Sequence, residues 1–112
     1  MIEFNGKTVW ITGASSGIGK ALALKISSLK ANIVLSSRNK EELGNVAKQC
    51  KGEPYILNLD LEEPESFEKA TQLVVKKYGS IDLLINNGGV SQRSKASQTS
   101  IEVDRKLMEI NY

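Results

Sequence analysis

Histidine is absent from this 112-residue sequence, and cysteine occurs once, as Cys50. A single cysteine cannot form an intramolecular disulfide, and a chain without histidine lacks the Cys/His clusters that hold structural zinc. No stretch approaches the roughly 20 apolar residues of a membrane-spanning helix, and the N-terminus lacks the basic and apolar regions of a signal peptide. We therefore expect a cytoplasmic protein with no structural metal and no membrane segment.

The charged side chains are nearly balanced, with 15 basic and 13 acidic residues giving a net charge of +2. They are dispersed along the sequence, so no basic stripe predicts binding to nucleic acid or to an anionic membrane. The composition, 40% hydrophobic and 25% charged, is typical of one soluble globular domain, which we expect to span residues 1–112.

Short apolar runs rich in β-branched residues predict four strands, over residues 8–12, 32–37, 55–59 and 81–86. These runs lack polar/apolar alternation, which indicates strands buried on both faces of a parallel sheet. Elsewhere apolar residues recur at helical intervals: Ile18, Leu22, Ile26 and Leu29; Leu43, Val46, Ala47 and Cys50; Phe67, Ala70, Leu73 and Val74; and, from about Ser100 to the end, Ile101, Leu107, Met108 and Ile110.

Proline and glycine mark the ends of the third predicted helix, because Pro64 is tolerated in a first turn and Gly79 supplies a stop. Gly44 lies inside the second, where glycine costs up to about 1 kcal/mol relative to alanine. The order β-α-β-α-β-α-β-α predicts an α/β fold with a doubly wound parallel sheet. In such sheets ligands bind at the carboxyl ends of the strands, where the strand order reverses, so the first βα turn is the expected ligand site.

That turn reads Thr12-Gly13-Ala14-Ser15-Ser16-Gly17-Ile18-Gly19. Gly13 lets the chain turn sharply off the strand, while Gly17 and Gly19 lack the Cβ atoms that would obstruct a pyrophosphate or the packing of helix on strand. The start of the helix offers unpaired N–H groups to an anion, and the serines add hydroxyl donors. The alternative is a purely structural glycine-rich turn.

The spacing is not that of a Walker A loop, and it resembles the T-G-x-x-x-G-x-G signature of the short-chain dehydrogenase/reductase family. The resemblance implies a Rossmann-like fold of which the first four βα units are present. It also implies a nicotinamide dinucleotide whose adenosine-side phosphates contact Gly13, Ser15, Ser16 and Ile18.

The end of the second strand, Val34-Leu35-Ser36-Ser37-Arg38, bears on the choice of cofactor. A carboxylate there would bind both ribose hydroxyls and repel a 2′-phosphate, whereas this chain has Ser37 followed by the guanidinium of Arg38. We therefore expect NADP(H) rather than NAD(H), unless Arg38 merely begins the solvated polar run that follows it.

Two further segments match the family pattern. Asp60 and Leu61, after the third strand, would line the adenine pocket, although an aspartate there is also an ordinary helix cap or turn residue. Asn86-Asn87-Gly88-Gly89 is similar to the family's N-N-A-G motif. One asparagine would tie neighbouring strand ends together, and Asn87 and Gly88 would approach the cofactor ribose. A plain Asn-Gly hairpin is disfavoured because residues 90–100 are too polar to supply a return strand.

Asn111 in the last predicted helix matches the family asparagine that interrupts helical bonding and whose carbonyl holds a water of the proton relay; otherwise it is an exposed surface residue. The resemblance further implies a small carbonyl or alcohol substrate, and a homo-oligomer at full length. Family catalysis needs a tyrosine followed four residues later by a lysine. Here Leu59 and Asp82 follow Tyr55 and Tyr78, and Tyr112 is the last residue. We therefore expect the cofactor-binding part of a longer oxidoreductase, or a non-catalytic dinucleotide-binding or regulatory module.

Overall fold

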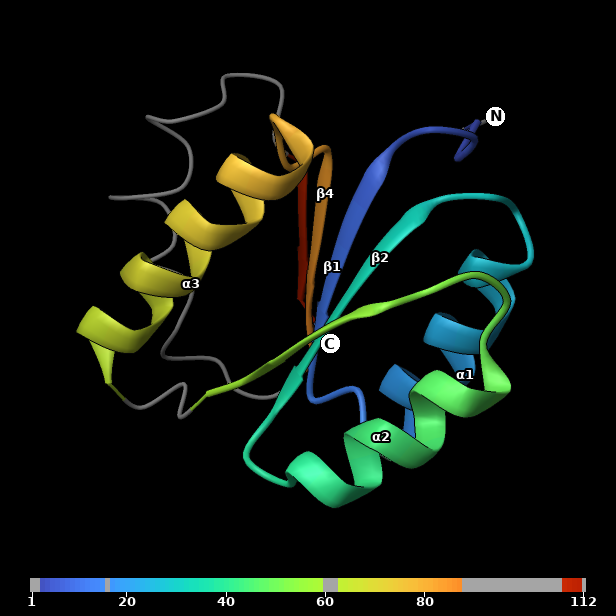
Figure 1. Ribbon diagram of the computed structural model, residues 1–112, viewed down its shortest axis with the longest axis horizontal. Helices are drawn as coiled ribbons and strands as arrows, with labels where there is room; N and C mark the ends of the chain where they lie inside the picture. Colours follow the sequence, from blue (N-terminus) through green and yellow to red (C-terminus); the bar gives the residue numbers. More distant parts are fainter. Residues whose placement is uncertain (1–2, 16, 60–62, 88–107, 112) are drawn as a thin grey trace.

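The computed structural model describes residues 3–15, 17–59, 63–87 and 108–111 (Figure 1). Its elements are β1 (Thr8–Thr12), α1 (Gly17–Ser27), β2 (Asn32–Ser37), α2 (Lys40–Gln49), β3 (Tyr55–Asn58), α3 (Pro64–Tyr78), β4 (Leu83–Asn86) and β5 (Met108–Asn111). The strands form one sheet in the order β3-β2-β1-β4-β5, and every neighbouring pair is parallel. The predicted doubly wound α/β fold is therefore confirmed.

The strand order reverses at β1, which pairs with β2 on one edge and with β4 on the other. The chain runs outward from β1 to β2 and β3, and then returns through α3 to the opposite side of β1. Figure 1 shows α1 and α2 on one face of the sheet and α3 on the other. The carboxyl ends of β1 and β4 thus form the switch point at which a ligand is expected.

Alternate residues of each central strand bury against opposite faces, which gives two apolar clusters. Val9, Ile11, Ile33 and Leu35 belong to the cluster under α1 and α2, and Trp10 and Val34 to the cluster under α3. All residues of β1 and β4 are buried, whereas β3, at the edge of the sheet, is only half-buried. The uninterrupted apolar runs in the sequence reflect this burial on both faces.

The helix boundaries follow local signals. Asn39 caps α2 by accepting a hydrogen bond from the backbone N–H of Glu42 at 3.0 Å. Pro64 begins α3, and Gly79 ends it in the left-handed conformation, with φ of 91° and its N–H bonded to the Val75 carbonyl. Helix α2 forms despite Gly44, whose missing Cβ would meet no atom within 4 Å.

The helical spacing of large apolar residues overstated their burial. Ile18 and Leu73 are 55% and 47% exposed, and Leu29 lies beyond the end of α1 and is 41% exposed. The buried face of α1 includes the small residues Gly19 and Ala23 instead. Small side chains let this helix approach the sheet closely, which a pattern of large apolar residues cannot reveal.

The prediction of a helix running to the end of the chain is wrong for residues 108–111, which form β5 beside β4. The segment reads Met-Glu-Ile-Asn, an apolar/polar alternation that fits a strand at the edge of a sheet. Pairing also satisfies the backbone groups along the edge of β4. Within the described residues, no helix is long and apolar enough to cross a membrane.

Candidate functional site

The glycine-rich turn leaves β1 at the switch point and leads directly into α1. Gly13 and Gly17 have φ angles of 62° and 60°, in the left-handed region that favours glycine. The backbone N–H of Ala14 donates to the carbonyl of Ser36 at 3.2 Å, which ties the turn to β2. The first N–H groups of α1 have no partner within the helix, so this turn and the helix start together offer donors to an anion.

Gly19 is required by close packing rather than by its backbone angle. A Cβ placed on it would overlap the Gly13 carbonyl and would lie 2.8 Å from the side-chain nitrogen of Asn87. Gly17, in contrast, has open space around its missing Cβ and is required by its positive φ. The two glycines therefore serve different physical purposes, although the sequence motif presents them alike.

Thr12 connects β1 to β4 through its hydroxyl, a role that the sequence analysis missed. The hydroxyl donates to the side-chain oxygen of Asn86 at 2.9 Å and accepts the backbone N–H of Asn87 at 3.1 Å. The side-chain amide of Asn87 in turn donates to the Gly13 carbonyl at 3.2 Å. Asn86 thus ties neighbouring strand ends, as the paired-asparagine motif predicted, while Asn87 buttresses the glycine turn.

The end of β2 lies beside this network and exposes Arg38. The Ser37 carbonyl accepts the backbone N–H of Leu59 at 3.1 Å and the side-chain amide of Asn58 at 2.8 Å. The Ser37 hydroxyl accepts the backbone N–H of Asn39 at 3.0 Å. Arg38 itself is exposed. With serine in place of a carboxylate, this end of the sheet carries no negative side chain at the position that would oppose a phosphate.

The remaining predicted site residues are placed as follows. Ser15 is half-buried in the turn, and Ile18 is exposed in the first turn of α1. Ser16, Asp60, Leu61 and Gly88 lie outside the described residues. Asn111 pairs with Asn86 in register across β4 and β5. Because Asn111 lies in a strand, the prediction that it interrupts a helix is wrong, and its role in a proton relay stays a prediction.

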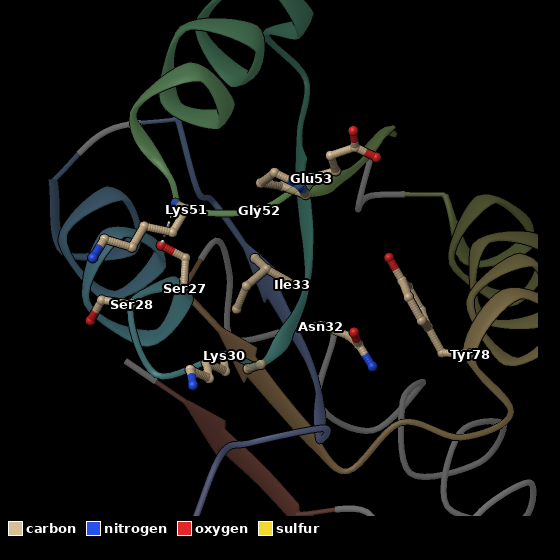
Figure 2. A pocket seen from close by; sticks show the side chains of 11 residues that line it. Ser27, Ser28, Lys30, Asn32, Ile33, Lys51, Gly52, Glu53 and Tyr78 are labelled. Atoms are coloured by element: carbon tan, nitrogen blue, oxygen red, sulfur yellow. Dashed lines mark hydrogen bonds between the residues drawn. The ribbon is translucent and has the colours of Figure 1, made fainter.

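The opposite, amino edge of the sheet holds a cavity of about 360 Å³, shown in Figure 2. Its lining includes Ser27, Lys30, Asn32, Lys51, Glu53 and Tyr78. Helices α1, α2 and α3 end at this edge with their carbonyl groups, so none of these helices directs its N-terminus, the end that suits a pyrophosphate, to the cavity.

The surroundings of Tyr78 disfavour ionisation of its phenol. Burial raises the pKa of its phenol, and the neighbouring Tyr55 raises it further, whereas general acid–base work at neutral pH needs a lowered value. The ammonium group of Lys77 lies 5.3 Å and 5.5 Å from the ring centres of Tyr55 and Tyr78, at the amino edge. In the part of the chain that the structure describes, no group of acidic, cysteine or histidine side chains could hold a metal ion.

Comparison with known proteins points to one family. The model of the short chain dehydrogenases matches residues 7–112. The chain is 45% identical to human dehydrogenase/reductase SDR family member 7, over 98% of this chain and 34% of that protein. It is 32% identical to an uncharacterized oxidoreductase of Staphylococcus epidermidis, over 99% of this chain and 48% of that protein. The chain therefore spans about a third to a half of the length of these relatives.

Solved structures agree with this result. A metagenomic short-chain oxidoreductase in complex with NADP is 35% identical and superposes with a TM-score of 0.75, over 80% of this chain and 42% of that one. A short-chain dehydrogenase/reductase from Brucella melitensis reaches a TM-score of 0.86 at 20% identity, over 98% of this chain and 57% of that one, which supports the fold alone.

Proposed function

Since this chain belongs to the short-chain dehydrogenase/reductase family, with oxidoreductases among its relatives, we propose that residues 1–112 are the N-terminal part of a single dinucleotide-binding domain. The parent enzyme would use NADP(H) to interconvert a carbonyl and a secondary alcohol. The observation that carries this proposal is the left-handed glycine turn at the switch point, with Gly19 packed against Gly13 and Asn87.

The residues at the turn fit the phosphates of a dinucleotide. The backbone N–H groups at the start of α1, with the positive end of the helix dipole, would hold the pyrophosphate. Asn87 and Thr12 fix the turn in the conformation that exposes those groups. When bound, the nicotinamide supplies or accepts a hydride. We place the tyrosine and lysine that move the proton outside these 112 residues, because no tyrosine here is followed by lysine at the required spacing.

Arg38 supports NADP(H) as the cofactor. It is exposed at the carboxyl end of β2, and Ser37 stands where a carboxylate would favour NAD(H). The similar metagenomic oxidoreductase was solved in complex with NADP, which is consistent with this preference.

The test is calorimetric titration of the full-length polypeptide containing this chain with NADPH and NADH. We expect tighter binding of NADPH, and we expect Arg38→Gln to weaken it about 10-fold or more, since a charge-assisted bond contributes about 1.5–3 kcal/mol. NADH affinity should change little. Lys40→Gln, a matched loss of positive charge two residues away, should leave both affinities nearly unchanged. A protein that binds neither NADPH nor NADH would refute the proposal.

A second candidate, a dinucleotide-binding module without catalysis, is favoured by one observation: the Tyr-x-x-x-Lys pattern is absent from these residues. Turnover of NADPH against a panel of carbonyl compounds separates the two. Binding without turnover, in a polypeptide that also lacks this pattern beyond Tyr112, would establish the module.

A further inference from the structure

Trp10, the only tryptophan of the sequence, lies in the middle of β1 and is completely buried. Its ring stacks on Phe67 of α3, with ring centres 5.0 Å apart and planes within 6° of parallel. Its indole N–H donates to the hydroxyl oxygen of Ser36 on β2 at 2.8 Å. A buried indole N–H without an acceptor is unfavourable, so this bond constrains where β2 lies relative to β1.

The bond runs obliquely across the two strands. Trp10 is the register partner of Val34, so its indole reaches two residues further along β2, to the row where Ser36 faces Thr12. The carbonyl of Ser36 accepts the N–H of Ala14 in the glycine turn. Ser36 therefore connects three features: the core under α3, the turn that leaves β1, and the end of β2.

The end of β2 is where the proposed cofactor preference resides. Arg38 follows Ser36 by two residues and is exposed, so its position depends on how firmly the last residues of β2 are held. The neighbouring Ser37 carbonyl is fixed by Leu59 and Asn58 from the β3 side. From the β1 side, the hydrogen bond between the Trp10 indole and the Ser36 hydroxyl restrains the same end of β2.

We propose that Trp10 is a positioning residue for cofactor selection: its hydrogen bond to Ser36 holds the end of β2 so that Arg38 meets the 2′-phosphate. This inference rests on the proposed NADP(H) function and deepens it. NADH has no 2′-phosphate, so its affinity should depend on the bond much less. The hydrogen bond from Ala14 to Ser36 joins backbone atoms, so it remains when the side chain of Trp10 or Ser36 is replaced. It should therefore support the binding of NADPH and NADH equally in every variant.

The experiment measures NADPH and NADH affinities of the full-length protein and its Trp10→Phe, Ser36→Ala and double variants. Phenylalanine preserves a ring against Phe67 but has no N–H, and alanine at residue 36 preserves the strand while removing the acceptor. We expect each single variant to bind NADPH about fivefold more weakly, as for the loss of one hydrogen bond, and NADH less than twofold more weakly. The double variant should resemble the singles, because both remove the same bond.

Phe67→Leu is the matched control, because it removes the stacked ring and leaves the indole bond in place. It should lower the free energy of unfolding without changing the NADPH/NADH affinity ratio. The difference in tryptophan emission between the wild type and Ser36→Ala adds a readout, since loss of the acceptor should shift the emission of Trp10 to shorter wavelength.

The outcomes separate the two proposals. A wild-type protein that prefers NADPH, with the same affinity ratio in Trp10→Phe and Ser36→Ala, overturns the positioning role and leaves the proposed function intact. A wild-type protein that binds both nucleotides without preferring NADPH overturns the positioning role and the choice of NADP(H), and a wild-type protein that binds neither overturns the proposed function as well. If Trp10→Phe does not fold, Ser36→Ala alone decides, because serine and alanine differ by one oxygen atom.

Discussion

The carboxyl edge of the sheet relies more on side-chain hydrogen bonds than the amino edge does. At the carboxyl edge, the side chains of Thr12, Asn86 and Asn87 connect β1, β4 and the glycine turn. At the amino edge, most cross-links are between backbone groups: Gly6 N–H to the Lys30 carbonyl, Asn32 to Lys7, and Asp82 to Thr8. Two side chains contribute as well: the carboxylate of Asp82 accepts the N–H of Thr8 at 2.8 Å, and the hydroxyl of Ser27 accepts the N–H of Lys51 at 3.2 Å.

This difference suggests that the carboxyl edge determines cofactor binding and that the amino edge contributes to stability alone. At the carboxyl edge, the first N–H groups of α1 have no partner within the helix and would be available to a ligand, whereas at the amino edge the backbone N–H groups of Gly6, Asn32 and Asp82 are already bonded. Substitutions at the carboxyl edge should therefore change affinity for a dinucleotide, and substitutions at the amino edge should change only the free energy of unfolding.

The largest effect is expected for Gly19→Ala. Its methyl group would overlap the Gly13 carbonyl and crowd the Asn87 amide, so the turn or the helix must move. Overpacking against backbone costs about 1–3 kcal/mol, and at the upper end NADPH affinity falls about 100-fold. Calorimetric titration measures this loss.

Gly44→Ala is the matched control in α2, where the added methyl group meets no atom within 4 Å. It should leave NADPH affinity unchanged and raise the free energy of unfolding by up to about 1 kcal/mol, the helix preference of alanine over glycine. Equal effects of the two substitutions would show that the close approach at Gly19 has no bearing on the site.

Thr12→Val should produce the next largest effect. Valine keeps the shape of threonine but deprives the Asn86 oxygen and the Asn87 N–H of their partner. Leaving buried polar groups unpaired costs about 1–3 kcal/mol each, so urea denaturation should show a loss of at least about 2 kcal/mol together with weaker NADPH binding. Thr12→Ser retains the hydroxyl and should keep most of the stability and most of the NADPH affinity. A serine variant that loses as much of either quantity as the valine variant would contradict the hydrogen-bond argument.

Asp82→Ala tests the amino edge. The N–H of Thr8 loses its acceptor, and we expect unfolding to become easier by about 1–2 kcal/mol. NADPH affinity, measured well below the midpoint of denaturation, should stay within twofold of wild type. If Asp82→Ala lowered NADPH affinity without lowering stability, the conclusion that the amino edge affects stability alone would be wrong.

The smallest effect concerns Cys50, which follows α2 near the amino edge. Burial raises the pKa of its thiol, although a hydrogen bond with Ser27 partly opposes this. Less thiolate forms at neutral pH, so iodoacetamide should label the folded chain more slowly than the urea-unfolded chain, and the difference should narrow as the pH rises above 9. Saturating NADPH should not alter the labelling rate, because the cofactor would bind at the other edge.

The sequence analysis succeeded where local signals act. Strand positions follow from short apolar runs. Pro64 and Gly79 mark the ends of α3, because proline restricts the backbone at its own position and glycine allows the left-handed conformation at its own. The tight turn at Gly13 was likewise predicted from residues close together in the chain, and its role as the ligand site stays a prediction. The fold class followed from the order of these elements alone.

It failed where the structure depends on distant partners. The hydroxyl of Thr12 acquires its role from asparagines 74 and 75 residues away, and the indole of Trp10 from Ser36 on another strand. The apolar positions from Ile101 to Ile110 fit a helix, and the four residues 108–111 alone fit a strand; the adjacent edge of β4 decides between the two for residues 108–111. The hydrophobic periodicity of a segment can be read from its own sequence. The pairing register of a strand depends on a second strand, so it cannot.

The central position of β1 has a consequence for synthesis on the ribosome. This strand emerges before the other strands of these residues, and its β2 partner follows soon after, but Asn86, whose side chain bonds the Thr12 hydroxyl, is 74 residues further along the chain. One edge of Val9, Trp10 and Ile11 is thus left unpaired until most of these residues have been translated. Among the strands whose burial the structure describes, β1 is completely buried once folded, and yet one of its edges waits longest for its partner during synthesis.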